Sequence, residues 1–172
     1  GLVNAEGLFE HLFDELIDRD FEQLHIPFSA AATHYSEGIE VVLDSGPLLP
    51  SVKASMAVPG IFAPVSLAQG PLVDGGLTNN LPCSHIPKNL DLIIASDVIN
   101  LPKDQEPSST QAMSGAIDIM LVNATQQKLS AHPADFIFQP ETGGIDIFDF
   151  HKINDILERG QEEAESRFTE LQ

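Results

Sequence analysis

The chain of 172 residues is 42% hydrophobic, enough to bury one core, so we expect a single domain over residues 1–172. Its formal net charge of −18, from 26 acidic against 8 basic residues, repels phosphate backbones and anionic lipid surfaces, which argues against nucleic acid as a partner. The single cysteine, Cys83, excludes an internal disulfide framework and a multi-cysteine zinc site.

The sequence carries no signal for a membrane or for export. No apolar run approaches the roughly 20 residues of a membrane span, and no charged-then-apolar leader opens the chain. We therefore expect a soluble, cytoplasmic protein. Because the chain begins with Gly1 directly before a helical pattern, we also expect it to be an excised or truncated piece of something longer.

The first third of the chain predicts a helix followed by a hairpin. Asn4 can cap a helix through about residue 19, and the apolar positions of that helix are Leu8, Leu12, Phe13, Leu16 and Ile17. Two β-rich runs flank SEG at residues 36–38, so residues 26–43 are predicted as a hairpin. The apolar run FSAAA predicts a strand covered on both sides.

The middle of the chain predicts a short helix and two strands. The segment LPSVKASMAVPG begins as a helix that Pro59 and Gly60 stop. PLVD is a brief strand ending at Asp74, and DLIIASDV, residues 91–98, has the pattern of a buried strand suited to a parallel sheet.

The last third predicts two helices around a short strand. Ser108 and Gln111 form a reciprocal capping pair for a helix to about residue 128, whose buried face would be Met113, Ile117, Met120, Leu121 and Ala124. ADFIFQP is a strand, and a closing helix carries Ile153, Ile156, Leu157, Ala164, Phe168 and Leu171 on one side. Helices alternating with short apolar strands favour a layered α/β fold.

The stretch PLVDGGLTNNLP places the carboxylate of Asp74 at a strand end, where α/β sheets commonly build sites. Gly75 and Gly76 would let the backbone adopt positive φ and leave space beside the carboxylate. The alternative is an ordinary Asx-type turn, since Asp-Gly is frequent in turns. From the dipeptide alone the turn is the favoured interpretation.

The wider pattern resembles bacterial patatin-like phospholipases, closely over about residues 1–100 and weakly beyond. The resemblance rests on an ordered set of segments: GLVNAEGLFEHL, IPFSAAATHYSEGIEVVLDSGPL, VKASMAVPGIFAPV, PLVDGGLTNNLP and DLIIASDV. It implies a layered α/β/α fold with a mainly parallel sheet, of which this chain is the C-terminal part. It further implies a Ser–Asp dyad that hydrolyses lipid acyl esters without a cofactor, with Asp74 as the general base.

Such a base is chemically reasonable, because a serine hydroxyl is a weak nucleophile and needs a base within about 3 Å. The family's serine, however, lies in a G-x-S-x-G elbow, and no such box occurs in these residues. Ser114 lies in a predicted helix downstream of Asp74, and Ser55 lacks the glycines of an elbow. We interpret Ser55 as structural, its hydroxyl tying down a helix end near Asp74. His34 also departs from the family, which often has Asp there.

The first hypothesis is therefore that the serine and the oxyanion loop belong to an N-terminal segment of the parent protein, and that this chain alone is inactive. The second is a non-catalytic binding or assembly module that kept the sheet. A third is an acyl-binding protein with a groove at Val58–Val65. The six histidines show no i,i+4 pair, no adjacent cysteine and no shared short loop, so no metal site is expected. The expected partner is a lipid or acyl ester substrate. Transient contact with a neutral membrane or micelle stays open, and so does the oligomeric state.

Overall fold

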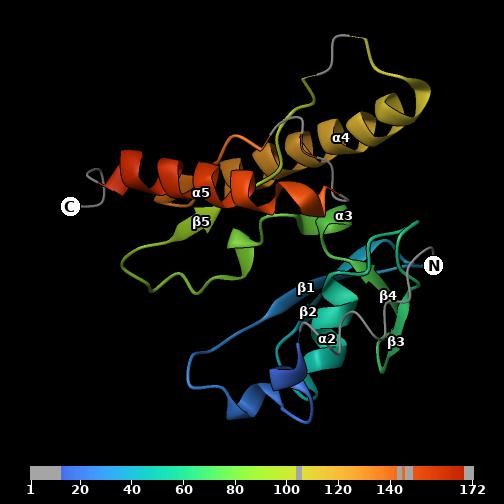
Figure 1. Cartoon of the computed structure of the whole chain (residues 1–172). Coiled ribbons are helices and arrows are strands. Elements are labelled where there is room, and N and C mark those ends of the chain that lie inside the picture. The colour runs from blue at the N-terminus through green and yellow to red at the C-terminus, as the bar shows by residue number, and fades with distance from the viewer. Residues whose placement is uncertain (1–12, 104–105, 143–144, 146–148, 169–172) are drawn as a thin grey trace. The chain divides into compact units, whose positions relative to one another are not determined.

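The computed structural model describes residues 13–103, 106–142, 145 and 149–168 (Figure 1). The chain divides into two compact units, Gly1–Asn80 and Leu81–Gln172, each with its own sheet. The expectation of a single domain stays a prediction. Among the described residues, no helix combines the length and the apolar composition that a bilayer crossing requires.

The first unit is built on a four-stranded antiparallel sheet in the order β2-β1-β4-β3. Its strands are β1 (Ala30–His34), β2 (Ile39–Leu43), β3 (Val65–Leu67) and β4 (Gly70–Asp74). The predicted hairpin is confirmed, because Gly38 takes a φ of +64° in the turn and donates its N–H to the His34 carbonyl at 2.8 Å. The predicted strand ending at Asp74 is also confirmed.

Helix α2 (Leu48–Ser55) packs on this sheet, as Figure 1 shows, and contacts β1, β3 and β4. It ends at Ser55, before the predicted breakers Pro59 and Gly60. The core between helix and sheet consists of Phe21, Ala30, Ala32, Leu43, Leu48, Ala54 and Leu72. Burying a large apolar side chain stabilises the fold by about 1.5–3 kcal/mol. This layer therefore holds the end of β4 in place.

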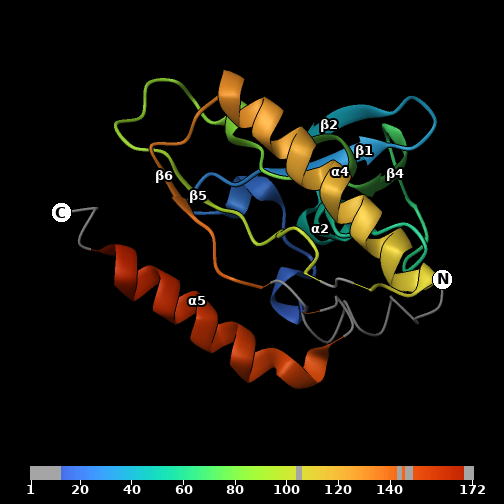
Figure 2. The same ribbon diagram turned by 90° about the horizontal axis from the view of Figure 1, so that it is seen from above.

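The second unit contains a two-stranded parallel sheet of β5 (Ile94–Ser96) and β6 (Phe136–Phe138). Helix α4 (Ser109–Ala131) joins the two strands, and α5 (Ile153–Arg167) follows β6. In the view of Figure 2 the strands run between the two helices. The capping pair is confirmed: the Gln111 N–H donates to the Ser108 hydroxyl at 3.3 Å, and the Ser108 N–H donates to the Gln111 side chain at 3.0 Å.

The α/β class is confirmed, whereas the mainly parallel sheet is confirmed only in part. The larger sheet is antiparallel because short turns join β1 to β2 and β3 to β4, and a tight turn reverses the chain. β1 and β4, which are far apart in the chain, also pair antiparallel, whereas β5 and β6, which are separated by the long helix α4, run in the same direction.

Three predictions of burial or extent are wrong. Along α4, Met113, Ile117 and Met120 are 68%, 45% and 71% exposed, and the buried positions are Gly115 and Thr125. In β5, which lies in the run predicted as a buried strand, only Ala95 is buried and its two neighbours are exposed. The predicted first helix reaches a 3-10 turn at Asp14–Leu16 and stops before residue 19, since Asp18 has a φ of +59°; its earlier part lies outside the described residues.

The apolar side of α5 is also exposed rather than packed, with Ile153, Leu157 and Phe168 all more than half accessible. Leu171 lies outside the described part of the chain. The physical reason is that α5 uses its charged side for contact with β6: the guanidinium of Arg167 lies 4.5 Å from the centre of the Phe136 ring. Periodicity located these helices, but it did not decide which side faces the neighbouring strand.

Candidate functional site

Asp74 is the last residue of β4, and two neighbours hold its backbone. Its N–H donates to the Ala57 carbonyl at 3.0 Å, and its own carbonyl accepts the hydroxyl of Thr33 at 2.9 Å. In the sheet it lies opposite Ala32, so its side chain leaves the sheet on the same side as that core residue. The carboxylate is therefore half-buried at a fixed strand end.

The environment of the carboxylate raises its affinity for a proton. Burial raises the pKa of Asp74 above its ordinary value of 3.8, and the hydrogen bond from the Gly76 N–H to Oδ1, at 2.7 Å, opposes that rise. The Asx-type turn considered from the sequence is thus present, but it occupies only Oδ1. Oδ2 accepts no further hydrogen bond from any described residue.

Gly75 is needed for a different reason from the one predicted for the two glycines. Gly75 has a φ of −67°, and Gly76 is not among the residues with positive φ, so the expectation of positive φ is wrong. A Cβ on Gly75 would instead lie 2.2 Å from the Ala31 carbonyl oxygen, closer than any real contact. Glycine at 75 therefore allows the turn after Asp74 to run directly against β1.

Ser55 supports the motif through its backbone. Its carbonyl accepts the Gly75 N–H at 3.3 Å, which joins the end of α2 to the turn after Asp74. The prediction that the hydroxyl makes this link is wrong; the described structure shows no hydrogen bond from that hydroxyl.

Two residues that the sequence analysis did not single out hold the short helix α3 (Gly76–Asn79) that follows Asp74. Thr33 is 4% exposed, and its hydroxyl lies 2.8 Å from that of Thr78. Asn79 is 3% exposed and donates to the Glu40 carboxylate at 2.6 Å. A threonine directly after the apolar run AAA was the available signal, because a buried polar group requires a partner.

The described cavities do not include the carboxylate. One, of about 400 Å³, is lined by Leu16–Asp20 with Pro47, Leu49 and Pro50, and another, of about 430 Å³, is lined by Ser84 and residues of α4 and its end. Neither is lined by Asp74 or by Val58–Val65, so the proposed acyl groove has no support here. Within the described ranges, no group of three or more His, Cys, Asp or Glu side chains is arranged to hold a metal ion.

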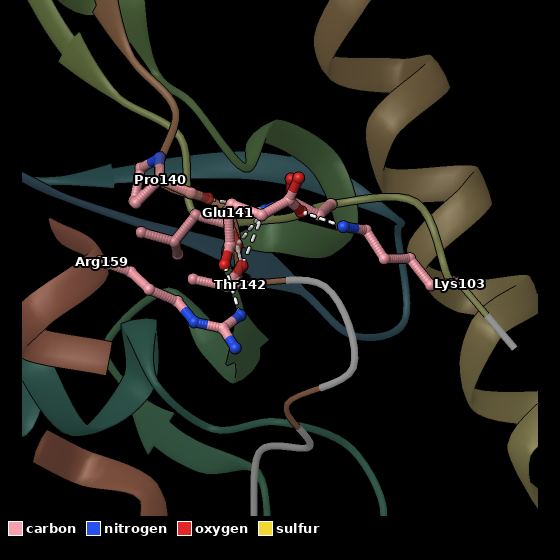
Figure 3. Close-up of polar contacts among 7 residues, drawn as sticks. Lys103, Pro140, Glu141, Thr142 and Arg159 are labelled. Carbon is pink, nitrogen blue, oxygen red and sulfur yellow. Dashed lines mark hydrogen bonds and ion pairs between the residues drawn. The ribbon is translucent and has the colours of Figure 1, made fainter. Parts of the chain in front are cut away.

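The carboxyl ends of β5 and β6 are a second place where α/β folds bind ligands. Figure 3 shows that the polar side chains there bind one another and the backbone after β6. Asn100 donates to the Pro140 carbonyl at 3.0 Å and to the Thr142 hydroxyl at 2.7 Å. Lys103 pairs with Glu141 at 2.9 Å, and Arg159 donates to the carbonyl of the same glutamate at 2.6 Å. These contacts join the loops that follow the two strands. The polar groups at this edge therefore hold the structure together.

Comparison with known proteins finds a family match over about the first half of the chain. Residues 2–85 match the patatin-like phospholipase family. Over 115 residues the chain is 35% identical to the uncharacterized NTE family protein Rv1063c of Mycobacterium tuberculosis, covering 64% of this chain and 32% of that protein. It is also 30% identical over 95 residues to lysophospholipase NTE1 of Pyricularia oryzae, covering 55% of this chain and 6% of that protein. The chain thus spans about a third or less of the length of these relatives.

Proposed function

The chain belongs to the patatin-like phospholipase family over residues 2–85, and from this premise we propose that it is the aspartate-bearing part of a serine hydrolase that cleaves lipid acyl esters. In this proposal Asp74 is the general base of a Ser–Asp dyad, and the serine and the oxyanion donors belong to a part of the parent protein outside residues 1–172. The chain alone has no esterase activity.

The observation that carries the proposal is the state of the Asp74 carboxylate. One oxygen is fixed by the Gly76 N–H, and the other accepts no hydrogen bond from a described residue. Burial raises the pKa of the group, so it takes up a proton more readily than an exposed aspartate does. A general base needs an oriented acceptor atom and a proton affinity suited to the transfer.

The chemistry would proceed in two halves. As the serine oxygen attacks the ester carbonyl, the hydroxyl proton passes to Oδ2 of Asp74, and the protonated carboxyl then gives that proton to the leaving alcohol. In the second half a water molecule loses its proton to Asp74 and attacks the acyl-enzyme; the bond to the serine oxygen breaks, the carboxyl returns the proton to that oxygen, and the fatty acid and the free serine are released. No cofactor enters either half.

For the substrate class we propose phospholipids or lysophospholipids, because the matched family is described as phospholipase-like and one relative as a lysophospholipase. The net charge of −18 disfavours adsorption to anionic bilayers, so neutral interfaces or micelles are the expected form of the substrate.

Replacing Asp74 by Asn in the longer parent protein tests the role of the carboxylate. We expect kcat/KM on a phospholipid or nitrophenyl ester to fall by about 10²–10⁴-fold, the usual contribution of a general base, with the circular dichroism unchanged. Asp97→Asn is the matched control, because it removes another shielded carboxylate outside the proposed site and should leave turnover unchanged. Normal turnover by the Asp74→Asn parent would refute the dyad, as would esterase activity of the 172-residue chain alone.

The absence of a G-x-S-x-G box from these residues favours one alternative, a binding or assembly module without catalysis. The gene sequence upstream of Gly1 separates the two functions. A glycine-rich loop and a G-x-S-x-G box within about 100 residues upstream of Gly1 would support the hydrolase. A start codon directly before Gly1 would support the binding or assembly module.

A further inference from the structure

Two threonine hydroxyls lie behind the backbone of Asp74. Thr33 donates its hydroxyl proton to the Asp74 carbonyl at 2.9 Å, and the hydroxyl oxygens of Thr33 and Thr78 are 2.8 Å apart. A hydroxyl has one proton to donate, and that of Thr33 is used on the carbonyl, so Thr78 is the donor in the second bond. The two bonds therefore form a directed chain from Thr78 through Thr33 to the Asp74 carbonyl, in which each bond polarises and strengthens the other.

This hydroxyl chain reaches Asp74 from the face of the sheet opposite to its carboxylate. The register pairs Asp74 with Ala32, and Thr33 with Val73. Side chains of successive strand residues leave a sheet on opposite faces, so the side chain of Thr33 does not lie on the side of the Asp74 carboxylate. An effect of the hydroxyls on chemistry at the carboxylate therefore has to pass through the backbone.

The two peptide groups that follow Asp74 decide where its carboxylate points. The second carries the Gly76 N–H, which donates to Oδ1 at 2.7 Å, and the Gly75 carbonyl, which accepts the first hydrogen bonds of α3. The first carries the Asp74 carbonyl, held by Thr33, and the Gly75 N–H. That N–H donates to the Ser55 carbonyl at 3.3 Å. Both groups are thus held at both ends, and the contact of Thr33 is one that a side-chain substitution removes.

We propose that Thr33, supported by Thr78, is a positioning residue for the general base: its hydroxyl holds the peptide group of Asp74 so that the Gly76 N–H stays on Oδ1 and Oδ2 stays turned toward the reacting serine. This inference rests on the proposed function of Asp74. A threonine suits the role because a β-branched side chain in a strand has few rotamers, so its hydroxyl stays in one place.

Replacing Thr33 by Val in the parent protein tests the role, because valine keeps the branched shape and lacks the hydroxyl. We expect kcat to fall by up to about 10²-fold, the cost of a small misplacement of a reacting group, with KM unchanged. The Gly76 hydrogen bond opposes the rise of the Asp74 pKa, so loosening that bond raises the pKa further. A base acts in its deprotonated form, so the acidic limb of the pH profile of kcat/KM should move to higher pH.

A conservative variant and a matched control accompany this change. Thr33→Ser keeps a hydroxyl and should return kcat and the acidic limb close to their wild-type values. Thr125→Val in α4 removes another buried hydroxyl, one without a hydrogen-bond partner among the described residues, and should change neither. An unchanged kcat in Thr33→Val would overturn the proposal. A lower kcat with the acidic limb in place, or a loss that Thr33→Ser shares, would also overturn it, because a merely structural role gives those results.

If circular dichroism shows that Thr33→Val does not fold, the decision rests on Thr78→Val, which leaves the bond between Thr33 and Asp74 and removes the bond that supports it. The acidic limb should then move in the same direction by a smaller amount, and a limb that stays in place overturns the proposal. Asp74→Asn separates this inference from the proposed function. Normal turnover by Asp74→Asn refutes the dyad, whereas an inactive Asp74→Asn beside a fully active Thr33→Val refutes the positioning role alone.

Discussion

At the scale of single residues, the geometry around Asp74 depends on one close backbone approach. The turn after the aspartate lies so near β1 that residue 75 has no room for a side chain, and the Thr33 hydroxyl fixes the aspartate carbonyl from the same strand. The sequence predicted a functional carboxylate at a strand end, and that position is confirmed. The reason that the sequence analysis gave for the glycines, a positive φ, is wrong. A local pattern shows conformational freedom, but it does not show the distance to a neighbouring strand.

Gly75→Ala should destabilise the 172-residue chain. The new Cβ would meet the Ala31 carbonyl oxygen at 2.2 Å, which is backbone and cannot move without shifting β1. We expect a loss of about 1–3 kcal/mol or more in the free energy of unfolding, measured with urea. Gly160→Ala in α5 is the control, since its Cβ meets nothing within 4 Å and the helix should gain roughly 0.5–1 kcal/mol. Equal stability of the two variants would contradict the packing described for the motif.

Asp97 gives a prediction about pH. Burial raises the pKa of this carboxyl above its ordinary 3.8, against the opposing hydrogen bond from the Ile99 N–H. The folded protein then holds the proton more tightly than the unfolded chain, so this group lowers the free energy of unfolding as the pH rises from 3.8 through the raised pKa. Replacing Asp97 by Asn removes this pH-dependent loss of unfolding free energy.

The unfolding free energy of Asp97→Asn should therefore improve relative to wild type as the pH rises through that window, and the difference should be constant well below it. Urea titrations at a series of pH values measure the difference. Asp74 titrates in both proteins and cancels from the comparison. A difference that stays flat, or that grows in favour of wild type, would show that Asp97 is not shielded as the structure has it.

At the scale of elements, helix limits follow local chemistry while helix faces do not. The start of α4 after Ser108 is set by its capping pair, which sequence spacing predicts. Its packed side is set by Gly115, which lets the helix approach Pro102 closely. Met113 and Met120 therefore face away, although their spacing is that of a buried face.

Two serines of α4 separate these effects. Ser108→Ala removes the cap that accepts the Gln111 N–H, and we expect a loss of about 0.5–2 kcal/mol. Ser114→Ala, at an exposed interior position of the same helix, should be neutral or stabilising by up to about 0.5 kcal/mol. Thermal unfolding followed by circular dichroism measures both. If Ser114→Ala were the more damaging change, the helix would not begin where the structure begins it.

At the scale of the whole molecule, the dominant property is charge. Twenty-six acidic side chains against eight basic ones repel one another in the compact state. The few cations of the second unit are used for specific contacts, among them Arg159 and Arg167, which bind backbone carbonyls after and within β6. The excess of negative charge is therefore left to the solvent to screen.

Sodium chloride should stabilise the folded chain. Raising its concentration from about 0.01 M to about 1 M shortens the Debye length from roughly 30 Å to 3 Å and weakens the self-repulsion of the acidic surface. We expect the unfolding midpoint to rise with salt, as measured by thermal denaturation at neutral pH. Potassium chloride at equal ionic strength is the control and should give the same rise. A midpoint that falls with both salts would show that the surface ion pairs outweigh the net charge.

The sequence by itself determined the features that depend on neighbouring residues: the hairpin around Gly38, the strand that ends at Asp74 and the cap of α4. Turn residues, caps and alternation act within a few positions, so they can be recognised without the fold. Only the tertiary structure decided the direction of the strands in the larger sheet, the side on which α4 and α5 pack, and the need for Gly75. These features depend on which segments that are distant in the sequence come into contact. A pattern within a few neighbouring residues does not contain that information.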